Sequence, residues 1–423
     1  MHLSPSRLHV HLLFTPRRSS KARLLRNLPP FPILVDYRFI RWKKGELSLL
    51  LAALEHHGRV RGISLGTRIS RDPTEIFEAL SRHFPELESL EIGSGDRPDY
   101  MTLPDAFLLG SASRLRRLKL EDPEPRYLSA LLSTATGLVD LSLAIKVPLN
   151  PEESLIQSLI ANLQGMPCLR RLELGLTYPM WYHFIMGDDH TPLLPPPTGD
   201  IFPLPNLMEL VLTGEHIYLE SLVAELAAPS LQRLNADFTD ATHGAHIPHL
   251  CRLISDTEHQ FRLVRLDFSD FQLQFTAETR SESVHAQPFR ISIPRPNSLE
   301  EIGNMLSGPL TTVEELVIRW NSDGRDIAQW RGFLNHTRQV KRLQVSWQVA
   351  CEVASSFQQN DQEPDMDLLP ALEQVNMDMA RFRPQEQGAV IPVAFNPLIA
   401  ARKKIGRPIT LSHTDVNWMG NAP

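Results

Sequence analysis

Apolar and polar positions recur along the chain as the phrase L-x-x-L-x-L, in which the leucines are separated first by two positions and then by one. Complete copies span residues 115–120, 138–143, 169–174 and 207–212, and weaker copies span 87–92, 263–268, 313–318 and 340–345. A phrase that returns roughly every 25 to 30 residues is the signature of a leucine-rich-repeat solenoid. The pattern therefore predicts a stack of repeats with one strand each.

The fourth position of the phrase gives each predicted strand a reference residue in the core. Strand side chains alternate between two faces, so the apolar residues point inward and the polar residues between them face the concave side. The reference residues are Ile63, Leu90, Leu118, Leu141, Leu172, Leu210, Leu234, Leu266, Leu316, Leu343 and Val375. They predict about eleven repeats.

Segments between the phrases have the spacing and the start signals of helices. Asp72 and Pro73 precede an apolar face at 76–80, as a capping carboxylate and a first-turn proline do. Pro248 opens a similar segment with apolar residues at 250–254. The predicted fold class is α/β: an irregular leucine-rich-repeat solenoid with a parallel concave sheet, helices on the convex face, and insertions.

The array divides into four predicted segments: a basic N-terminal repeat-like segment (1–58), a leucine-rich-repeat region (59–268), an irregular strand-rich insertion (269–312), and C-terminal repeats with a tail (313–423). The first segment has strand patterns at 8–12 and 33–37. A proline-rich insertion at 178–206 expands one repeat of the second. In the third, residues 271–275 and 290–293 predict an extra hairpin or ribbon at one edge of the sheet.

Charge is distributed unevenly along the chain. The first 61 residues hold twelve Lys and Arg against three Asp and Glu, a formal charge of +9, whereas the whole chain has −6. A basic head can indicate a targeting peptide, a nucleic acid or an acidic partner. The alternation at 8–12 and the prolines at positions 29, 30 and 32 argue against the amphipathic helix of a mitochondrial presequence.

Three widely separated cysteines, Cys168, Cys251 and Cys351, favour a reducing compartment and buried packing positions over disulfides or zinc. We therefore expect a cytoplasmic or nuclear protein, and Cys168 in particular is predicted to be a buried packing residue. No apolar run reaches 18 residues, so no membrane span is expected.

Longer stretches resemble the F-box/leucine-rich-repeat proteins of basidiomycete fungi. They are PSRLHVHLLFTPRRSSKARLLRNLPPFPILVDY near the start, LPDAFLLGSASRLRRLKL at 103–120, LLSTATGLVDLSL at 131–143, LIANLQGMPCLRRLEL at 159–174, the proline-rich loop before FPLPNLMEL, and AARKKIGRPITLS near the end. In that family an F-box usually precedes the repeats and docks on a Skp-type adaptor of a cullin ubiquitin ligase. The repeats select the substrate, so the resemblance implies protein binding.

The resemblance covers the repeats and not the F-box. No F-box precedes Leu8, and LPDAFL at 103–108 lies between two repeat phrases, so we expect an incomplete product or a repeat-only relative. The leading interpretation is the substrate-recognition region of an F-box adaptor, which binds an unknown protein substrate, and a Skp-type adaptor only if an F-box exists upstream. The alternative is a repeat-only scaffold unrelated to ubiquitination.

The sequence predicts no enzyme, no cofactor and no metal site. No H-E-x-x-H or phosphate-loop motif occurs. The triplet His243-x-x-His246-x-x-His249 has a spacing of three rather than the helical spacing of four, and Pro248 interrupts it. These histidines are therefore predicted to be solvated loop side chains.

Partner contacts are predicted at polar positions inside the phrases and in the proline-rich insertion, because solenoids bind partners with outward strand residues and loops. Basic and acidic residues alternate at these positions. The candidate contacts are Arg116, Arg117, Asp140, Arg170, Arg171, Glu173, Glu209 and, in the insertion, Trp181. The basic run at 17–23 has no interleaved aromatic residues, so nucleic acid is not expected as a partner.

Overall fold

The computed structural model describes residues 10–13, 31–37, 44–66, 74–93, 107–147, 154–177, 201–239, 247–257, 259–269, 272–279, 289–294, 299–320, 327–358, 367–378 and 395–414. The chain divides into two compact units, Met1–Leu231 and Gln232–Pro423, called here the N-terminal and the C-terminal unit.

The N-terminal unit is built on a parallel sheet. In its described part, eight strands follow one another across the sheet in chain order. They are β1 (Val10–Leu13), β2 (Ile33–Tyr37), β3 (Val60–Leu65), β4 (Ser89–Ile92), β5 (Arg117–Glu121), β6 (Asp140–Lys146), β7 (Arg171–Thr177) and β9 (Glu209–Gly214). The strands expected near 8–12 and 33–37 are confirmed as β1 and β2.

The reference residues of this unit lie side by side in the core. The register pairs, in order across the sheet, Ile63, Leu90, Leu118, Leu141, Leu172 and Leu210. Each of these side chains is at most 2% exposed. Burying a leucine contributes roughly 1.5–3 kcal/mol, and a slip of one residue would turn the whole row to solvent. The repeated row therefore fixes the register, as the phrase predicted.

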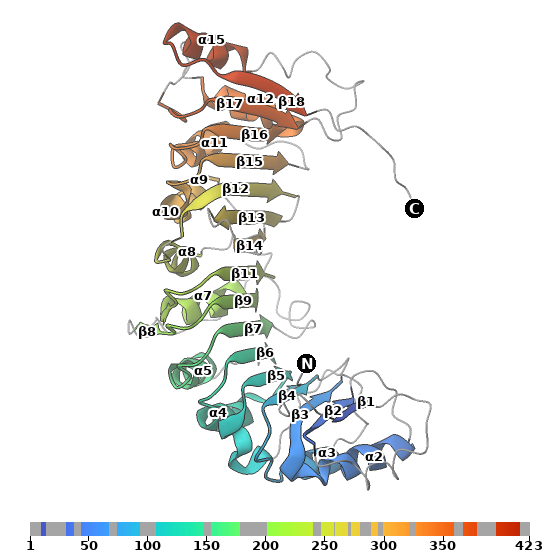
Figure 1. The fold of residues 1–423 in the computed structure, drawn as a ribbon. Helices are drawn as coiled ribbons and strands as arrows, with labels where there is room; N and C mark the ends of the chain where they lie inside the picture. The colour runs from blue at the N-terminus through green and yellow to red at the C-terminus, as the bar shows by residue number, and fades with distance from the viewer. Residues whose placement is uncertain are drawn as a thin grey trace, which may run out of the picture. The chain divides into compact units, whose positions relative to one another are not determined.

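Helices cover one face of this sheet (Figure 1). They are α2 (Lys44–Leu54), α3 (Thr74–Leu80), α4 (Pro125–Thr134), α5 (Ser154–Gln164) and α7 (His216–Ala224), with the 3-10 segments η2 (His57–Arg59) and η3 (Phe107–Arg114). Pro125 stands in the first turn of α4, where its missing N–H forfeits no helical hydrogen bond. The apolar rows face the helices. The opposite side of the sheet, called the strand face, presents the alternating polar residues, such as Glu91, Lys119 and Glu173.

The C-terminal unit has a mixed sheet. In its described part the strand order is β11, β14, β13, β12, β15, β16, β17, β18. The bounds are β11 (Arg233–Phe238), β12 (Phe261–Phe268), β13 (Gln272–Thr279), β14 (Phe289–Pro294), β15 (Glu315–Trp320), β16 (Arg342–Ser346), β17 (Gln374–Asp378) and β18 (Thr410–Thr414). The strands from β12 through β15 to β18 pair in parallel, whereas β13 is antiparallel to both of its neighbours.

The hairpin expected after residue 268 exists, but its expected place at an edge of the sheet is wrong. β13 and β14 lie within the sheet, because β14 pairs in parallel with β11 while β13 pairs with β12. β12 therefore does not stack directly on the preceding repeat strand. The hairpin lies between β11 and β12 and pairs with both, so each of these strands has hydrogen-bond partners that an edge strand would lack.

The reference residue predicted for β12 is also wrong, by two positions. Val264, and not Leu266, lies beside Leu316. Both side chains point to the same face and both are 0% exposed, so the apolar pattern does not distinguish them. From Leu316 the register continues through Leu343 and Val375 to Leu411, which adds β18, a strand that the phrase did not predict.

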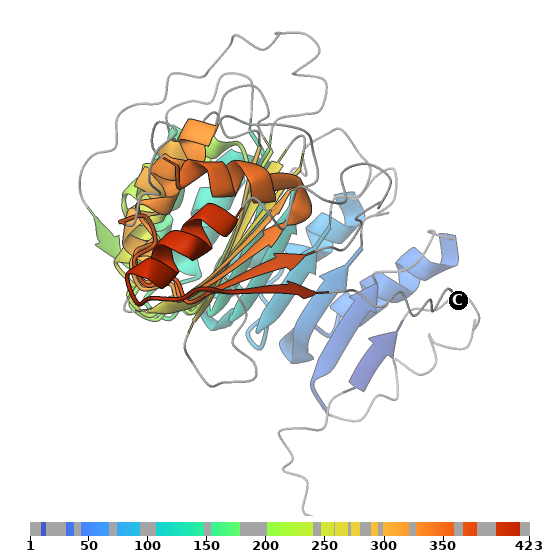
Figure 2. The same ribbon diagram turned by 90° about the horizontal axis from the view of Figure 1, so that it is seen from above.

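The helices of the C-terminal unit are α8 (Pro248–Ser255), α9 (Leu299–Met305), α10 (Ser307–Leu310), α11 (Ile327–Leu334), α12 (Trp347–Ser356) and α15 (Asn396–Lys404). In Figure 2 the red helix α15 and the orange helices before it lie on one side of their strands. Strands that alternate with helices on one face make each unit an irregular α/β leucine-rich-repeat solenoid, as expected. None of the helices in the described ranges has the length and apolarity that a membrane span needs.

Candidate protein-binding face

Four of the predicted contact residues form one row on the strand face of the N-terminal unit. Register places Arg117 beside Asp140, Asp140 beside Arg171, and Arg171 beside Glu209, on β5, β6, β7 and β9. Neighbouring strands lie about 4.8 Å apart, so opposite charges alternate at close range along the row. This row is called the charged ladder.

Arg171 is the centre of the charged ladder. Its Nη2 donates to Oε2 of Glu173 at 3.0 Å, and its Nε lies 3.7 Å from Oε1 of Glu209. The side chain is 42% exposed, so solvent screens these pairs and they contribute little to stability. These ion pairs hold the charged side chains in place but contribute little to stability, so the charges remain available to a partner protein.

Asp140 is a half-buried acid of the charged ladder. Burial raises the pKa of its carboxyl above the ordinary value, and the guanidinium groups of Arg171 and Arg117 partly offset this by lowering the same pKa. The carboxylate is therefore held between two cations that compensate only part of its lost hydration.

Arg116 and Arg170 lie apart from the charged ladder, just before the strands β5 and β7. Arg116 donates from Nη1 to the carbonyl oxygen of Gly137 at 2.7 Å, so its guanidinium joins two successive repeats. The backbone N–H of Arg170 donates to the carbonyl oxygen of Val139, and its side chain is exposed. The pairs Arg116-Arg117 and Arg170-Arg171 are thus each divided between a position just before the strand and the strand face.

The strand face also has a hollow that the sequence analysis missed. A depression of about 540 Å³ lies over β2 to β5, between Asp36, Ser64 and Glu91 on one side and Arg61, Glu88 and Arg116 on the other. The row that carries Arg117 on β5 continues as Ser89 on β4 and Gly62 on β3, so small residues line this part of the strand face. Two successive small residues in a row of otherwise large ones were the available sequence signal.

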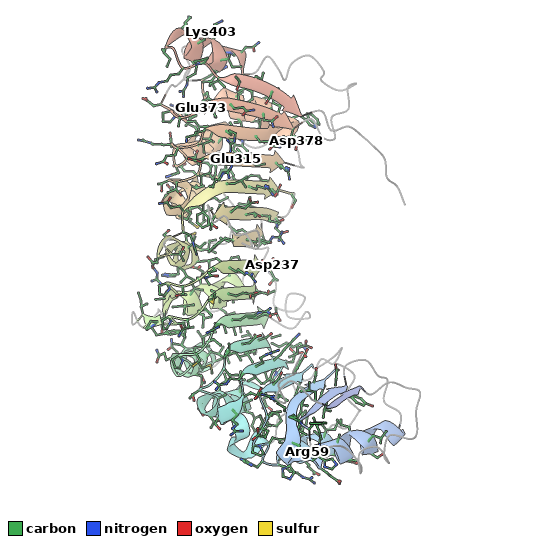
Figure 3. The ribbon with its side chains drawn as sticks, viewed as in Figure 1. Arg59, Asp237, Glu315, Glu373, Asp378 and Lys403 are labelled. Carbon is green, nitrogen blue, oxygen red and sulfur yellow. The ribbon has the colours of Figure 1, made fainter. Side chains whose placement is uncertain are left out.

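The strand face of the C-terminal unit carries a second charged group. Arg319 on β15 lies 3.9 Å from Asp267 on β12 and 3.7 Å from Asp378, which Figure 3 shows at the carboxyl end of β17. Arg342 donates from Nη2 to Oε2 of Glu315 at 2.8 Å, and this hydrogen bond raises the pKa of the guanidinium. In both units, therefore, side chains of opposite charge lie close together on the strand face.

Other predicted features have mixed outcomes. Trp181, His243 and His246 lie outside the described residues. The loop position predicted for His249 is wrong, because this residue lies on α8. Within the described ranges, no group of three or more His, Cys, Asp or Glu side chains is arranged to hold a metal ion. The prediction for Cys168 is wrong: it is exposed, whereas Cys251 is buried.

The reason for the exposure of Cys168 is local. In the turn before β7, Met166 and Leu169 are 0% and 1% exposed, and these two side chains fill the inward positions. The cysteine between them is left on the outer side of the turn.

No protein family model matches the sequence, and no curated protein matches it. Among solved structures, the leucine-rich repeat-containing protein LegL7 from Legionella pneumophila aligns over 97% of this chain and 91% of its own, with 11% sequence identity and a TM-score of 0.29.

Proposed function

We propose that the chain is a non-catalytic protein-binding module whose partner contacts the strand faces of its repeats. The charged ladder carries this proposal. Its four charged side chains lie in a row on neighbouring strands, and the ion pairs of its central Arg171 with Glu173 and Glu209 are too exposed to contribute much stability. Fixed, complementary charges serve partner choice and association rate more than folding.

The test is affinity capture with the full chain, followed by identification of the captured proteins. Arg171→Glu reverses the centre of the charged ladder and places it against Glu173 and Glu209. Arg82→Glu reverses an exposed charge in the turn after α3 and is the matched control. We expect partners of the wild-type chain to fall by about tenfold or more with Arg171→Glu and to persist with Arg82→Glu. Equal recovery by both variants, with unchanged thermal denaturation, would refute the strand face as the binding surface.

At a finer level, we propose that this module is the substrate-recognition region of an F-box adaptor of a cullin-type ubiquitin ligase. The ordered sequence stretches that resemble the fungal F-box/leucine-rich-repeat proteins support it. In this function the bound protein is the substrate, and the Skp-type adaptor binds an F-box encoded upstream. We expect the protein in the cytoplasm or the nucleus, where such ligases act.

Sequencing the natural transcript and the N-terminus of the natural protein tests the finer proposal. An in-frame F-box, together with capture of a Skp-type adaptor by the extended protein and not by residues 1–423, is the expected result. A natural protein that begins at Met1 and captures no such adaptor would instead favour a repeat-only scaffold.

A further inference from the structure

The turn that ends α15 carries exposed basic residues of the C-terminal unit. Lys403 and Lys404 stand in the last turn of this helix, where Figure 3 labels Lys403, and Arg407 follows the helix end. Residues 403–408 are all exposed, and Ile405, which lies among the three cations in the sequence, is 55% exposed. The four side chains of Lys403, Lys404, Ile405 and Arg407 are called the basic turn.

A glycine-dependent motif fixes the backbone of the basic turn. Gly406 has a φ of +75°, a left-handed conformation that glycine adopts without strain. Its N–H donates to the carbonyl oxygen of Lys403 at 3.2 Å, and the N–H of Arg407 donates to that of Arg402 at 2.9 Å. These two hydrogen bonds form a Schellman motif. The backbone that carries the cations and Ile405 is therefore ordered before any partner binds.

The three cations of the basic turn are available to a partner. Within the described ranges, Lys403, Lys404 and Arg407 form no ion pair and no side-chain hydrogen bond, whereas Arg342 on the strand face is paired with an acid. Burial, and after it repulsion by Arg407, lowers the pKa of Arg402. An anion bound at the turn would offset this excess of positive charge.

Stabilisation of α15 explains only part of this charge. The carboxyl end of a helix carries the equivalent of about half a negative elementary charge, which one cation offsets. The last turns of α8 and α11 have one basic residue each, whereas that of α15 has Arg402, Lys403 and Lys404. The excess cations therefore form a surface that complements an anionic partner.

The surroundings of the basic turn favour an acidic protein segment over other polyanions. Among residues 395–414, Phe395 is the only Phe, Tyr or Trp, and it is buried, so there is no stacking platform for single-stranded nucleic acid. Three cations are fewer than the roughly four to eight that are typical of segments that bind anionic membranes. A protein segment can supply both carboxylates and an apolar side chain for Ile405.

We propose that the basic turn binds an acidic segment of a protein partner. Carboxylates of this segment lie against Lys403, Lys404 and Arg407, and an apolar side chain lies against Ile405. The inference goes beyond the proposed function, because the contact is on α15 and not on a strand face.

The test measures binding of peptides to the full chain by isothermal titration calorimetry. The peptides are acetyl-Gly-Glu-Glu-X-Glu-Glu-Gly-amide with X as leucine or serine, and the leucine peptide with glutamines in place of its glutamates. We expect the acidic leucine peptide to bind at least about tenfold more tightly than the glutamine peptide and about threefold more tightly than the serine peptide, because each exposed ion pair and apolar contact contributes a small factor. Equal binding of the acidic leucine and glutamine peptides overturns the proposal.

Substitutions in the basic turn locate the binding, since the first 61 residues, with a formal charge of +9, also attract acidic peptides. The triple variant Lys403→Gln, Lys404→Gln and Arg407→Gln should weaken binding of the leucine peptide by about tenfold. The charge-preserving variant Lys403→Arg, Lys404→Arg and Arg407→Lys should bind like the wild type. Unchanged binding by the triple variant, or equal weakening by both, overturns the proposal.

Two single substitutions complete the test. Ile405→Ser should weaken the leucine peptide by about threefold and leave the serine peptide unchanged, because only leucine loses an apolar contact. Arg338→Gln removes an exposed charge of the same unit and is the matched control. It should leave binding unchanged, whereas weakening as large as that of the triple variant would show diffuse attraction and refute the site.

Competition distinguishes the kinds of partner. If oligodeoxythymidine or phosphatidylserine vesicles displace the leucine peptide at a lower concentration of negative charge than the peptide itself, an acidic protein segment is refuted as the ligand.

Affinity capture separates this inference from the proposed function. Loss of the partner with Arg171→Glu, together with peptide binding that the triple variant leaves unchanged, overturns the inference and leaves the proposed function standing. Peptide binding that depends on the basic turn, with capture unaffected by Arg171→Glu, supports the inference and refutes the strand face.

Discussion

At the scale of single residues, Gly214 is a position that no other residue can fill without strain. It ends β9 with a φ of +132°, and a Cβ there would overlap the carbonyl oxygen of Leu176 on β7. We expect Gly214→Ala to lower the free energy of unfolding by at least about 2 kcal/mol, because backbone strain and a steric clash add. Urea unfolding followed by circular dichroism measures this.

Gly58→Ala is the matched control for Gly214→Ala. A Cβ on Gly58 would meet no heavy atom within 4 Å. Its effect should stay within roughly 0.5 kcal/mol of zero. Comparable losses from both substitutions would contradict the steric explanation.

Arg402 is a buried cation that holds a turn of the C-terminal unit. It is 1% exposed, and its guanidinium donates to the carbonyl oxygens of Leu368, Leu369 and Pro370 at 3.2, 2.9 and 3.0 Å. Arg402→Ala should cost roughly 3 kcal/mol in urea unfolding, because it leaves several buried acceptors without a charged donor. Arg402→Lys should cost an intermediate amount, since one ammonium group cannot reproduce the fork of the guanidinium.

The neighbouring exposed Lys403 provides the control for Arg402, and Lys403→Ala should be nearly neutral. A loss as large as that of Arg402→Ala would indicate that helix charge, and not the three carbonyl contacts, stabilises this part of the unit.

At the scale of strands, the charged ladder predicts a pH dependence at Asp140. Burial is the main cause of its raised pKa, so the folded state binds the proton more tightly than the unfolded chain does. The ionised carboxylate is then the form that lowers stability. This cost is absent below the ordinary pKa of 3.8, grows as the pH rises through the folded pKa, and is fully present above it.

We therefore expect Asp140→Asn to gain stability relative to the wild type as the pH rises from 3.8, and to keep a constant advantage at higher pH. Urea unfolding at several pH values measures the difference. Ser142→Ala, two residues along the same strand, changes no titrating group and should shift stability equally at each pH. A relative loss of stability by Asp140→Asn with rising pH would show that the arginines outweigh burial.

Most strand positions could be predicted because parallel stacking brings equal phrase positions together. The repeated phrase alone is enough to predict the row of buried residues from Ile63 to Leu210. The register of β12 cannot be predicted in this way. Val264, Leu266 and Phe268 all point inward, and pairing with β15, which is distant in sequence, decides which of them lies beside Leu316.

The candidate site was predictable to the same extent. The charged ladder follows from the register, because Arg117, Asp140, Arg171 and Glu209 occupy equal positions of successive phrases. The hollow does not follow from the charged residues alone, because the small residues Gly62 and Ser89 are also among those that line it. The role of the charged ladder residues as partner contacts remains a prediction, which the binding experiments above test.

At the scale of the whole molecule, the division at Leu231 predicts that local damage stays within one unit. In repeat proteins each repeat is stabilised mainly by its neighbours, so a destabilised strand affects nearby strands before distant ones. Gly214→Ala should therefore speed amide hydrogen exchange in β7 and β9, and Arg402→Ala should speed it in β17 and β18. The exchange rates of β15 in the first variant and of β5 in the second should match the wild type. Hydrogen–deuterium exchange with mass spectrometry, on the full chain in low urea, reads all of these strands in one experiment. A uniform increase across both units would show that they unfold as a single cooperative structure, because exchange through global unfolding affects every strand alike.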